Sequence, residues 1–393
     1  MSTSAVIKFG GADLSTGEKI RHAAELVVQS PYTEKIVVVS AMGNTTNNLI
    51  DTMKSIGAVN DDDYAEIISM GERTSARIFC SALRTLGAKA VVFDPMDERW
   101  PIITNGGYHD AKPDMAQCRL FVQTFIKPIL REVIPVVCGF LGKSKEGRVT
   151  TLGRGGSDTT AMLLANCLEA DEVILVKDTS GVLSADPRLV PGAKPLDALD
   201  INEMFDLAHG GAKVIKSESL RQKLPSQKLR IVNFASEKLA EGGTEITGSF
   251  NMNSVETSSH RNLLAINVVC EVNSENLERI FSALSSKPIY GVSSGRGSLT
   301  VFTSNGKVRE ILNKLHALDV FKALSHRENV ALLQVRHPMF VDSPGGVARI
   351  STALSQSGIN IIEVTTSKAT INVFIEENQL KKATEAISHV NET

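Results

Sequence analysis

The sequence predicts an α/β protein in which a mostly parallel sheet is sandwiched by helices and is followed by two smaller βαββαβ units. Three observations lead to this prediction. Short apolar runs that end in glycine turns alternate with helical patterns up to about residue 177. The composition changes after Asn233, and the order strand, helix, strand, strand, helix then occurs twice. Strands that alternate with helices are typical of a parallel sheet with helices on its faces.

The strands expected in the first part are short runs rich in β-branched residues. They cover residues 5–9, 36–39, 90–93, 134–138 and 172–176, and helical patterns cover 18–28, 64–86, 120–130 and 161–168. In such sheets ligands bind outside the carboxyl ends of the strands. Glycine turns at 10–11, 43, 139–142 and 153–156 lie at or near such ends. The sequence therefore predicts one site where four distant segments converge.

Residues 235–262 are polar and rich in Ser, Glu, Gly and Asn, so we expect a linker there. A first domain would occupy residues 1–250, and the two small units would occupy 263–325 and 326–393. Strands are expected at 263–272, 289–293 and 298–302 in the first unit, and at 330–335, 359–365 and 368–375 in the second. Helices are expected at 276–284, 307–318, 345–357 and 379–389. Paired units of this kind often pack sheet edge to sheet edge.

Composition excludes several classes of protein. A chain of 393 residues, 42% hydrophobic and 22% charged, can bury the cores of two or three domains. The formal net charge of −2 offers no basic excess for nucleic acid, and no apolar run approaches the ~20 residues of a membrane span. The N-terminus shows no secretory signal. Five dispersed cysteines fit reduced thiols in a cytoplasmic protein.

The most specific segment is residues 139–158. Three glycines, Gly153, Gly155 and Gly156, surround Arg154, and Ser157 with Asp158 opens a helix. Glycines let main-chain N–H groups approach an anion, a helix start adds a positive dipole end, and an arginine can hold a carboxylate with two hydrogen bonds. The segment predicts an anion site, and the alternative is a loop that only turns the chain.

Lysines and small polar groups follow other predicted strands. Lys8 ends a strand before Gly10 and Gly11, and it could contact phosphate or remain a solvated surface lysine. The spacing of a Walker A loop is absent. Ser40 and Thr46 could bind a ligand or simply form a turn.

Three further segments are ambiguous when taken singly. Glu72 could bind an ammonium group or pair with Arg73 or Arg77. The stretch 178–188 could be a surface loop, and Lys213 is a second lysine that follows glycines.

Taken together, these segments resemble the aspartokinases of the amino acid kinase family. The matching motifs are KFGG at 8–11, SAMGNTTNNL at 40–49, GER at 71–73, TTLGRGGSDTTA at 150–161, SGVLSADPR at 180–188 and GAKV at 211–214. The resemblance covers about residues 7–217. The tail, residues 340–375 in particular, is similar to the ACT domains that follow the kinase domain in that family.

The resemblance implies the amino acid kinase fold over 1–250, followed by two ACT-like units. It implies transfer of the γ-phosphoryl group of ATP, with Mg²⁺, to the side-chain carboxylate of L-aspartate, the first step towards lysine, threonine, methionine or related products derived from aspartate. Lys8 and Lys213 would neutralise the phosphates, and Asp158 would hold both lysines. The groups implied to bind aspartate are Ser40, Thr46, Glu72, Arg154 and Ser157. The groups implied on the nucleotide side are Lys8, Phe9, Gly10, Gly11, Lys177, Asp178, Ser184, Asp186, Arg188 and Lys213. No side chain is assigned to a metal.

The tail also predicts regulation by an amino acid, lysine or threonine. A strand there ends in a Pro-Gly-Gly turn and a helix begins, so main-chain N–H groups could receive a carboxylate. The candidate contacts are Asp342, Gly345, Gly346, Val347 and Asn360. The alternative is that these residues only form a turn and the units only hold a homodimer or larger homo-oligomer together.

The sequence departs from the family pattern in three places. Ala12 stands where the family has Thr or Ser, Lys177 and Leu183 replace residues of a TDVDGVY motif, and Lys216-Ser217 replace His-Pro. Two other readings follow. One is a different kinase of the same fold, such as a uridylate, acetylglutamate or carbamate kinase. The other is an amino-acid sensor without catalytic activity, for which Ala12 is the main argument.

Overall fold

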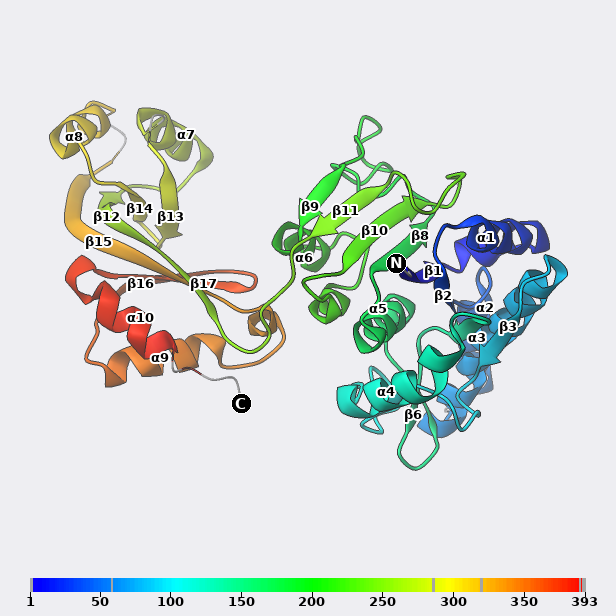
Figure 1. The fold of residues 1–393 in the computed structure, drawn as a ribbon. Coiled ribbons are helices and arrows are strands. Elements are labelled where there is room, and N and C mark those ends of the chain that lie inside the picture. Colours follow the sequence, from blue (N-terminus) through cyan, green and yellow to red (C-terminus); the bar gives the residue numbers. More distant parts are fainter. Residues whose placement is uncertain (1–2, 58, 285–286, 319–320, 389, 391–393) are drawn as a thin grey trace. The chain divides into compact units, whose positions relative to one another are not determined.

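The computed structural model describes residues 3–57, 59–284, 287–318, 321–388 and 390. The chain divides into two compact units, Met1–Phe250 and Asn251–Thr393, each with its own sheet (Figure 1). Among the described residues, no helix is long and apolar enough to cross a membrane.

The first unit is built on an eight-stranded sheet with the order β3-β5-β2-β1-β8-β10-β11-β9. The strands are β1 (Ser4–Phe9), β2 (Glu34–Val39), β3 (Ala90–Phe93), β5 (Ile134–Cys138), β8 (Glu172–Lys177), β9 (Ala198–Asp200), β10 (Lys228–Asn233) and β11 (Thr244–Thr247). Neighbours from β3 to β10 pair in parallel, and only the β10–β11 pair is antiparallel. The predicted parallel α/β architecture is confirmed.

The helices of this unit are α1 (Gly17–Gln29), α2 (Thr45–Ile56), α3 (Asp61–Thr85), α4 (Met115–Phe121), α5 (Gly156–Leu168) and α6 (Ile201–His209). Helix α3 packs on β2, β3 and β5 and against α1, whereas α5 packs on β1, β2 and β8 (Figure 1). A small three-stranded sheet adds β4 (Ile103–Thr104), β6 (Leu141–Ser144) and β7 (Val149–Thr151).

The helix predicted at 120–130 is wrong in its bounds and regularity. Helix α4 begins at Met115 and passes into a π turn, Val122–Ile126, and a 3-10 turn, Lys127–Ile129. Pro128 explains the irregular end, because proline has no N–H to donate and its ring clashes with the carbonyl one turn earlier.

The second unit contains one six-stranded antiparallel sheet with the order β13-β14-β12-β15-β17-β16. Its strands are β12 (Glu256–Val269), β13 (Ile289–Ser294), β14 (Leu299–Ser304), β15 (Ala323–Arg336), β16 (Ile361–Ser367) and β17 (Thr370–Glu376). Its helices are α7 (Ser274–Ala283), α8 (Val308–His316), α9 (Gly346–Gln356) and α10 (Leu380–Ser388). The predicted repeat of strand, helix, strand, strand, helix is confirmed, and residues 389 and 391–393 of the predicted second unit lie outside the described residues.

The long strands β12 and β15 are shared between the two repeats. Each strand contains one residue with left-handed backbone, Asn262 (φ 53°) and Asn329 (φ 56°). Residues 263–269 pair with 323–330, and residues 256–260 pair with 332–336. The first half of β15 therefore completes the first repeat as βαββαβ, and the first half of β12 supplies the fourth strand of the second repeat.

This exchange corrects two expectations. The predicted linker at 235–262 contains β11, which belongs to the first unit's sheet, and the start of β12. The boundary expected between 325 and 326 falls inside β15. The strand at 256–260 was missed because all five of its side chains are exposed, so its sequence shows no apolar alternation.

Candidate active site

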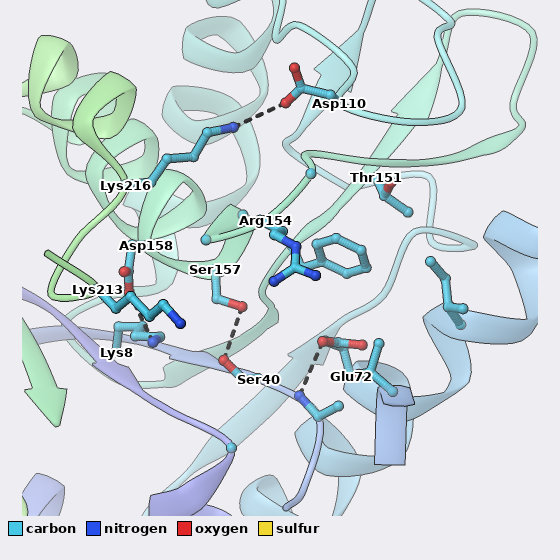
Figure 2. Close-up of a pocket in the computed structure, with 18 of the residues that line it drawn as sticks. Lys8, Ser40, Glu72, Asp110, Thr151, Arg154, Ser157, Asp158, Lys213 and Lys216 are labelled. Atoms are coloured by element: carbon cyan, nitrogen blue, oxygen red, sulfur yellow. Dashed lines mark hydrogen bonds and ion pairs between the residues drawn. The ribbon is translucent and has the colours of Figure 1, made fainter. Parts of the chain in front are cut away.

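A large pocket of the first unit lies at the carboxyl ends of β1, β2, β5 and β8, beside the start of α5 (Figure 2). Its volume is about 1040 Å³. Ten of the residues assigned to the aspartate or nucleotide site line it: Lys8, Gly11, Ser40, Thr46, Glu72, Arg154, Ser157, Asp158, Lys177 and Lys213. These residues come from segments far apart in the chain, so the predicted convergence at strand ends is confirmed.

A buried cluster of three charges forms one side of the pocket. Lys8 Nζ lies 2.9 Å from Asp158 Oδ1, and Lys177 Nζ lies 2.9 Å from Asp158 Oδ2. Burial would raise the pKa of Asp158, but Lys8 and Lys177 outweigh burial and hold that pKa at about 2. Burial lowers the pKa of Lys8 in spite of its carboxylate partner. The cluster carries a net charge of +1 when all three groups are ionised, which suits a polyphosphate.

The pairing of Asp158 corrects one expectation. Asp158 was expected to hold Lys8 and Lys213, and the structure pairs it with Lys8 and Lys177. The reason is topological. Lys177 ends β8, the strand next to β1, so it emerges beside Lys8. Lys213 lines the same pocket from the segment after α6.

Glu72 supplies a buried carboxylate on the other side of the pocket. The Ala41 N–H donates to Glu72 Oε1 at 3.1 Å, while Oε2 has no hydrogen-bond partner among the described residues. Burial raises the pKa of Glu72 to about 7. The alternative in which Glu72 pairs with Arg73 or Arg77 is wrong, because both arginines bind Asp94, at 2.9 and 2.7 Å.

Arg154 supplies a cation to the same cavity. It stands between Gly153 (φ 69°) and Gly155 (φ 71°), two left-handed positions that favour glycine. Its side chain is exposed and makes no ion pair or hydrogen bond within the described part of the chain. Figure 2 shows Arg154 and Glu72 directed into one cavity, with the Ser40 and Ser157 hydroxyls, 3.0 Å apart, nearby. The site thus offers an unpaired cation and an unpaired carboxylate oxygen together.

Six residues expected on the nucleotide side do not line this pocket. They are Phe9, Gly10, Asp178, Ser184, Asp186 and Arg188. The Phe9 side chain is fully buried against Phe79 and Phe234, so only its main chain could meet a ligand. Asp186 and Arg188 pair with each other at 2.7 Å in the loop after β8. The role of these six residues in binding the nucleotide stays a prediction.

Other residues at the site were not found from the sequence. Asp13 is buried and its Oδ2 accepts from the Gly10 N–H at 3.0 Å, so it shapes the turn after β1. Burial raises the pKa of Asp13. Asp13 is not among the lining residues, whereas Tyr64, His109, Asp110 and Lys216 line the pocket. Asp13 follows Ala12 next to the KFGG motif, and Lys216 stands at a position noted as a departure from the family pattern, whereas no local pattern marks the others.

The candidate effector residues lie in the second unit. Gly345 has φ 88° and precedes α9, which begins at Gly346, one residue after the predicted start at 345. Asp342, Val347 and Asn360 are exposed. Helix α9 therefore presents its first N–H groups beside the predicted contacts, and whether an amino acid binds there stays a prediction.

Family models match both units. The amino acid kinase family model matches residues 4–233, and an ACT domain model matches residues 325–389. An aspartokinase from Corynebacterium glutamicum is 31% identical over 409 residues, covering 97% of this chain and 94% of its own length. The chain belongs to the aspartokinases of the amino acid kinase family. An aspartokinase from Mycolicibacterium smegmatis, 29% identical, covers the same shares of both chains.

Solved aspartokinases share the fold. The aspartate kinase from Synechocystis superposes with a TM-score of 0.70 at 24% identity, covering 98% of this chain and 68% of its own. Aspartokinase III from E. coli, in complex with aspartate and ADP, superposes with a TM-score of 0.58 at 22% identity, covering 98% of both chains. Relatives named aspartokinase match along the whole chain, so neither another kinase of this fold nor a sensor without activity is favoured.

Proposed function

We propose that this aspartokinase transfers the γ-phosphoryl group of ATP to the side-chain carboxylate of L-aspartate, giving 4-phospho-L-aspartate. The observation that carries the proposal is that Arg154 and Glu72 Oε2 line one pocket and neither has a partner among the described residues. The charged cluster of Lys8, Asp158 and Lys177 lies beside them. An amino acid with a second carboxylate matches this pattern. Its ammonium group would meet Glu72 and one of its carboxylates would meet Arg154.

The reaction needs no general base. The aspartate side chain has a reference pKa of about 3.9 and is ionised at neutral pH. A carboxylate oxygen forms a bond to the γ-phosphorus as the bond from that phosphorus to the β–γ bridging oxygen breaks, and ADP leaves. The obstacle is repulsion between two anions, which positive groups and correct positioning remove.

The chain's own residues fit this demand. Lys8, Lys177 and Lys213 supply positive charge from three segments, and Asp158 fixes the first two. ATP brings Mg²⁺, which prefers phosphate and water oxygens with one or two carboxylates. When bound, the ion neutralises phosphate charge. Ser40 and Ser157 offer hydroxyl donors near Arg154 and help to orient the substrate carboxylate.

The test is an assay that couples ADP release to a change in absorbance. The protein should consume ATP with L-aspartate and Mg²⁺, and not with acetylglutamate, carbamate or uridylate. Arg154→Ala should raise the aspartate KM and lower kcat/KM by roughly 10²-fold, because a charge-assisted contact with two hydrogen bonds is lost. Arg21→Ala, an exposed arginine on α1, is the matched control. Unaltered aspartate dependence in Arg154→Ala would refute the assignment.

We also propose that the second unit binds an amino-acid effector through Asp342, the N–H groups of Gly345, Gly346 and Val347 at the start of α9, and Asn360. E. coli aspartokinase III has been crystallised with lysine and aspartate, so lysine and threonine are the ligands to titrate. An effector of this kind shifts apparent substrate affinity by about 5- to 150-fold. If calorimetry of the wild type shows no binding of either, or if Asp342→Ala binds equally well, this assignment fails.

The remaining expectations concern assembly and location. We propose a homodimer or larger homo-oligomer formed through the ACT-like units, which light scattering can test. The five cysteines are all free and buried, which suits the reducing cytoplasm proposed as its location.

A further inference from the structure

We infer that Lys216 and Asp110 form an ion pair that fastens the loop carrying Arg154, so that both are positioning residues for the binding of aspartate. The inference deepens the proposed function and rests on it for the identity of the substrate. Neither residue was assigned a role from the sequence.

The pair joins two distant segments across the Arg154 loop. Lys216 Nζ lies 3.0 Å from Asp110 Oδ1, and it also donates to the main-chain carbonyl of Leu152 at 3.2 Å (Figure 2). The Lys216 side chain is only 17% exposed, whereas Lys112, the other cation on Asp110, is 64% exposed. Solvent screens the Lys112 pair more strongly, so Lys216 is the partner that matters for position.

Both side chains lie directly against the glycines that flank Arg154. A Cβ added at Gly155 would lie 2.8 Å from Lys216 Cβ, and one added at Gly153 would lie 2.6 Å from Asp110 Oδ1. The two members of the ion pair therefore close on the loop from its two ends. Within the described residues Arg154 makes no hydrogen bond or ion pair of its own, so its position depends strongly on the backbone between these glycines.

The Asp110 side of the pair is itself anchored. The Ala111 N–H donates to the Thr151 carbonyl at 2.7 Å, and the Thr151 N–H donates to the Tyr108 carbonyl at 3.0 Å. Asp110 has φ 51°, a left-handed conformation that aspartate adopts more readily than most residues with a side chain. The main chain around Asp110 is therefore held in place, while its side chain is 53% exposed and is tied to the loop by Lys216.

Lys216 occupies a position where the sequence departs from the family pattern, which has His-Pro after GAKV. Glu218 lies 3.4 Å from Lys216 Nζ and is the competing carboxylate. Asp110 lies closer, and the Leu152 carbonyl holds the ammonium over the loop rather than towards Glu218. Both residues also line the pocket, and the role we assign to the pair is to position the Arg154 loop.

The kinetic test uses Lys216→Met, which keeps an apolar stem against Gly155 but removes the charge. The aspartate KM should rise roughly 5- to 30-fold, while kcat and the ATP KM change less than about 2-fold. Asp110→Asn should act similarly, and the double variant should be no worse than the poorer single variant. Lys216→Arg should restore most of the affinity. Lys112→Met is the matched control and should stay within about 2-fold of wild type.

Hydrogen exchange in the protein without ligands separates this inference from the proposed function. Amides 153–156 should exchange roughly 10-fold faster in Lys216→Met than in wild type or Lys112→Met. If exchange there is unchanged, or if the effects of the two single variants multiply in the double variant, the ion pair does not fasten the loop. If exchange responds but the wild type does not phosphorylate aspartate, the pair stands and the proposed function is what fails.

Discussion

Glu72 is the residue at which binding and stability oppose each other. It is 4% exposed, one of its oxygens lacks a partner among the described residues, and burial raises its pKa to about 7. The ordinary pKa of the group is 4.5. Because the folded pKa lies above the unfolded one, the folded state binds more protons between these values. Glu72 therefore destabilises the ligand-free fold increasingly as pH rises from about 4.5 to 7, and fully above pH 7.

Glu72→Gln should therefore stabilise the ligand-free protein at pH 8 by up to ~3 kcal/mol, since glutamine keeps the acceptor for the Ala41 N–H without the buried charge. The gain should shrink as the pH falls towards 5, and aspartate binding should be lost. Thermal melting and calorimetry at both pH values test this. Glu66→Gln, an exposed position on α3, is the control. An unchanged or lower Tm for Glu72→Gln at pH 8 would show that the buried Glu72 carboxylate does not destabilise the ligand-free fold.

The two lysines on Asp158 should differ in their effect on the rate. Lys8 is more deeply buried than Lys177, and its charge counts most as the phosphoryl group departs. We expect Lys8→Met to lower kcat by roughly 10²-fold or more with little change in the aspartate KM, and Lys177→Met to lower it less. Steady-state kinetics with Lys54→Met as an exposed control decide the matter. A near-normal kcat in Lys8→Met would make Lys8 a structural residue.

At the scale of single residues, site residues within sequence motifs were predictable, and residues that line the pocket outside these motifs were not. Lys8, Glu72, Arg154 and Asp158 stand in segments with a recognisable pattern. Lys216 and Asp110 are 106 residues apart and have no local pattern, so only the tertiary fold reveals that they meet. The second cation on Asp158 was misassigned for the same reason, because strand order decides which lysine emerges next to Lys8.

At the scale of elements, strands that are apolar along their length were predicted from the sequence, whereas helices and strands rich in polar residues were missed. Strands β3 and β5 have the predicted bounds. Strand β5 lies between β3 and β2, so both of its faces are covered and its residues are apolar, while β3 is a half-buried edge strand whose four residues are all apolar. Helix α2 was taken for a turn because its first residues are Thr and Asn and only Met53 is buried. The β6–β7 hairpin was missed because three of the four residues of β6 are glycine, lysine or serine.

The end of β5 and the start of α5 approach so closely that only glycine fits at position 139. A Cβ there would lie 2.7 Å from Ser157 Cβ and 2.9 Å from the Val39 carbonyl oxygen. Gly139→Ala should therefore cost about 1–3 kcal/mol, lower the Tm by several degrees and displace Ser157, reducing activity. Gly192→Ala, where nothing lies within 4 Å of the added carbon, is the control. Equal melting temperatures for the two variants would contradict the close approach.

At the scale of the whole molecule, the order of elements in the second unit was predictable and the sharing of strands between its repeats was not. The repeat of βαββα follows from local patterns, but pairing between residues 256–260 and 332–336 joins positions more than seventy residues apart. The stacked rings of Phe302 and Phe374, 3.6 Å between centroids, link β14 with β17 in one core. The two repeats are thus one folding unit rather than two independent modules.

This organisation predicts how the second unit tolerates truncation. A fragment of residues 251–393 keeps all six strands and its own cores, so it should fold and unfold cooperatively in urea. A fragment of residues 263–393 lacks the strand at 256–260 and leaves one edge of β15 unpaired. At roughly 1 kcal/mol for each lost hydrogen bond, it should be less stable by a few kcal/mol and more prone to aggregate. A fragment of residues 255–393 is the matched control, because it is also shortened but retains the strand and Val255, which packs on the second repeat. If 263–393 unfolds at the same urea concentration as the other two fragments, residues 256–260 are a linker after all and the shared-strand arrangement is wrong.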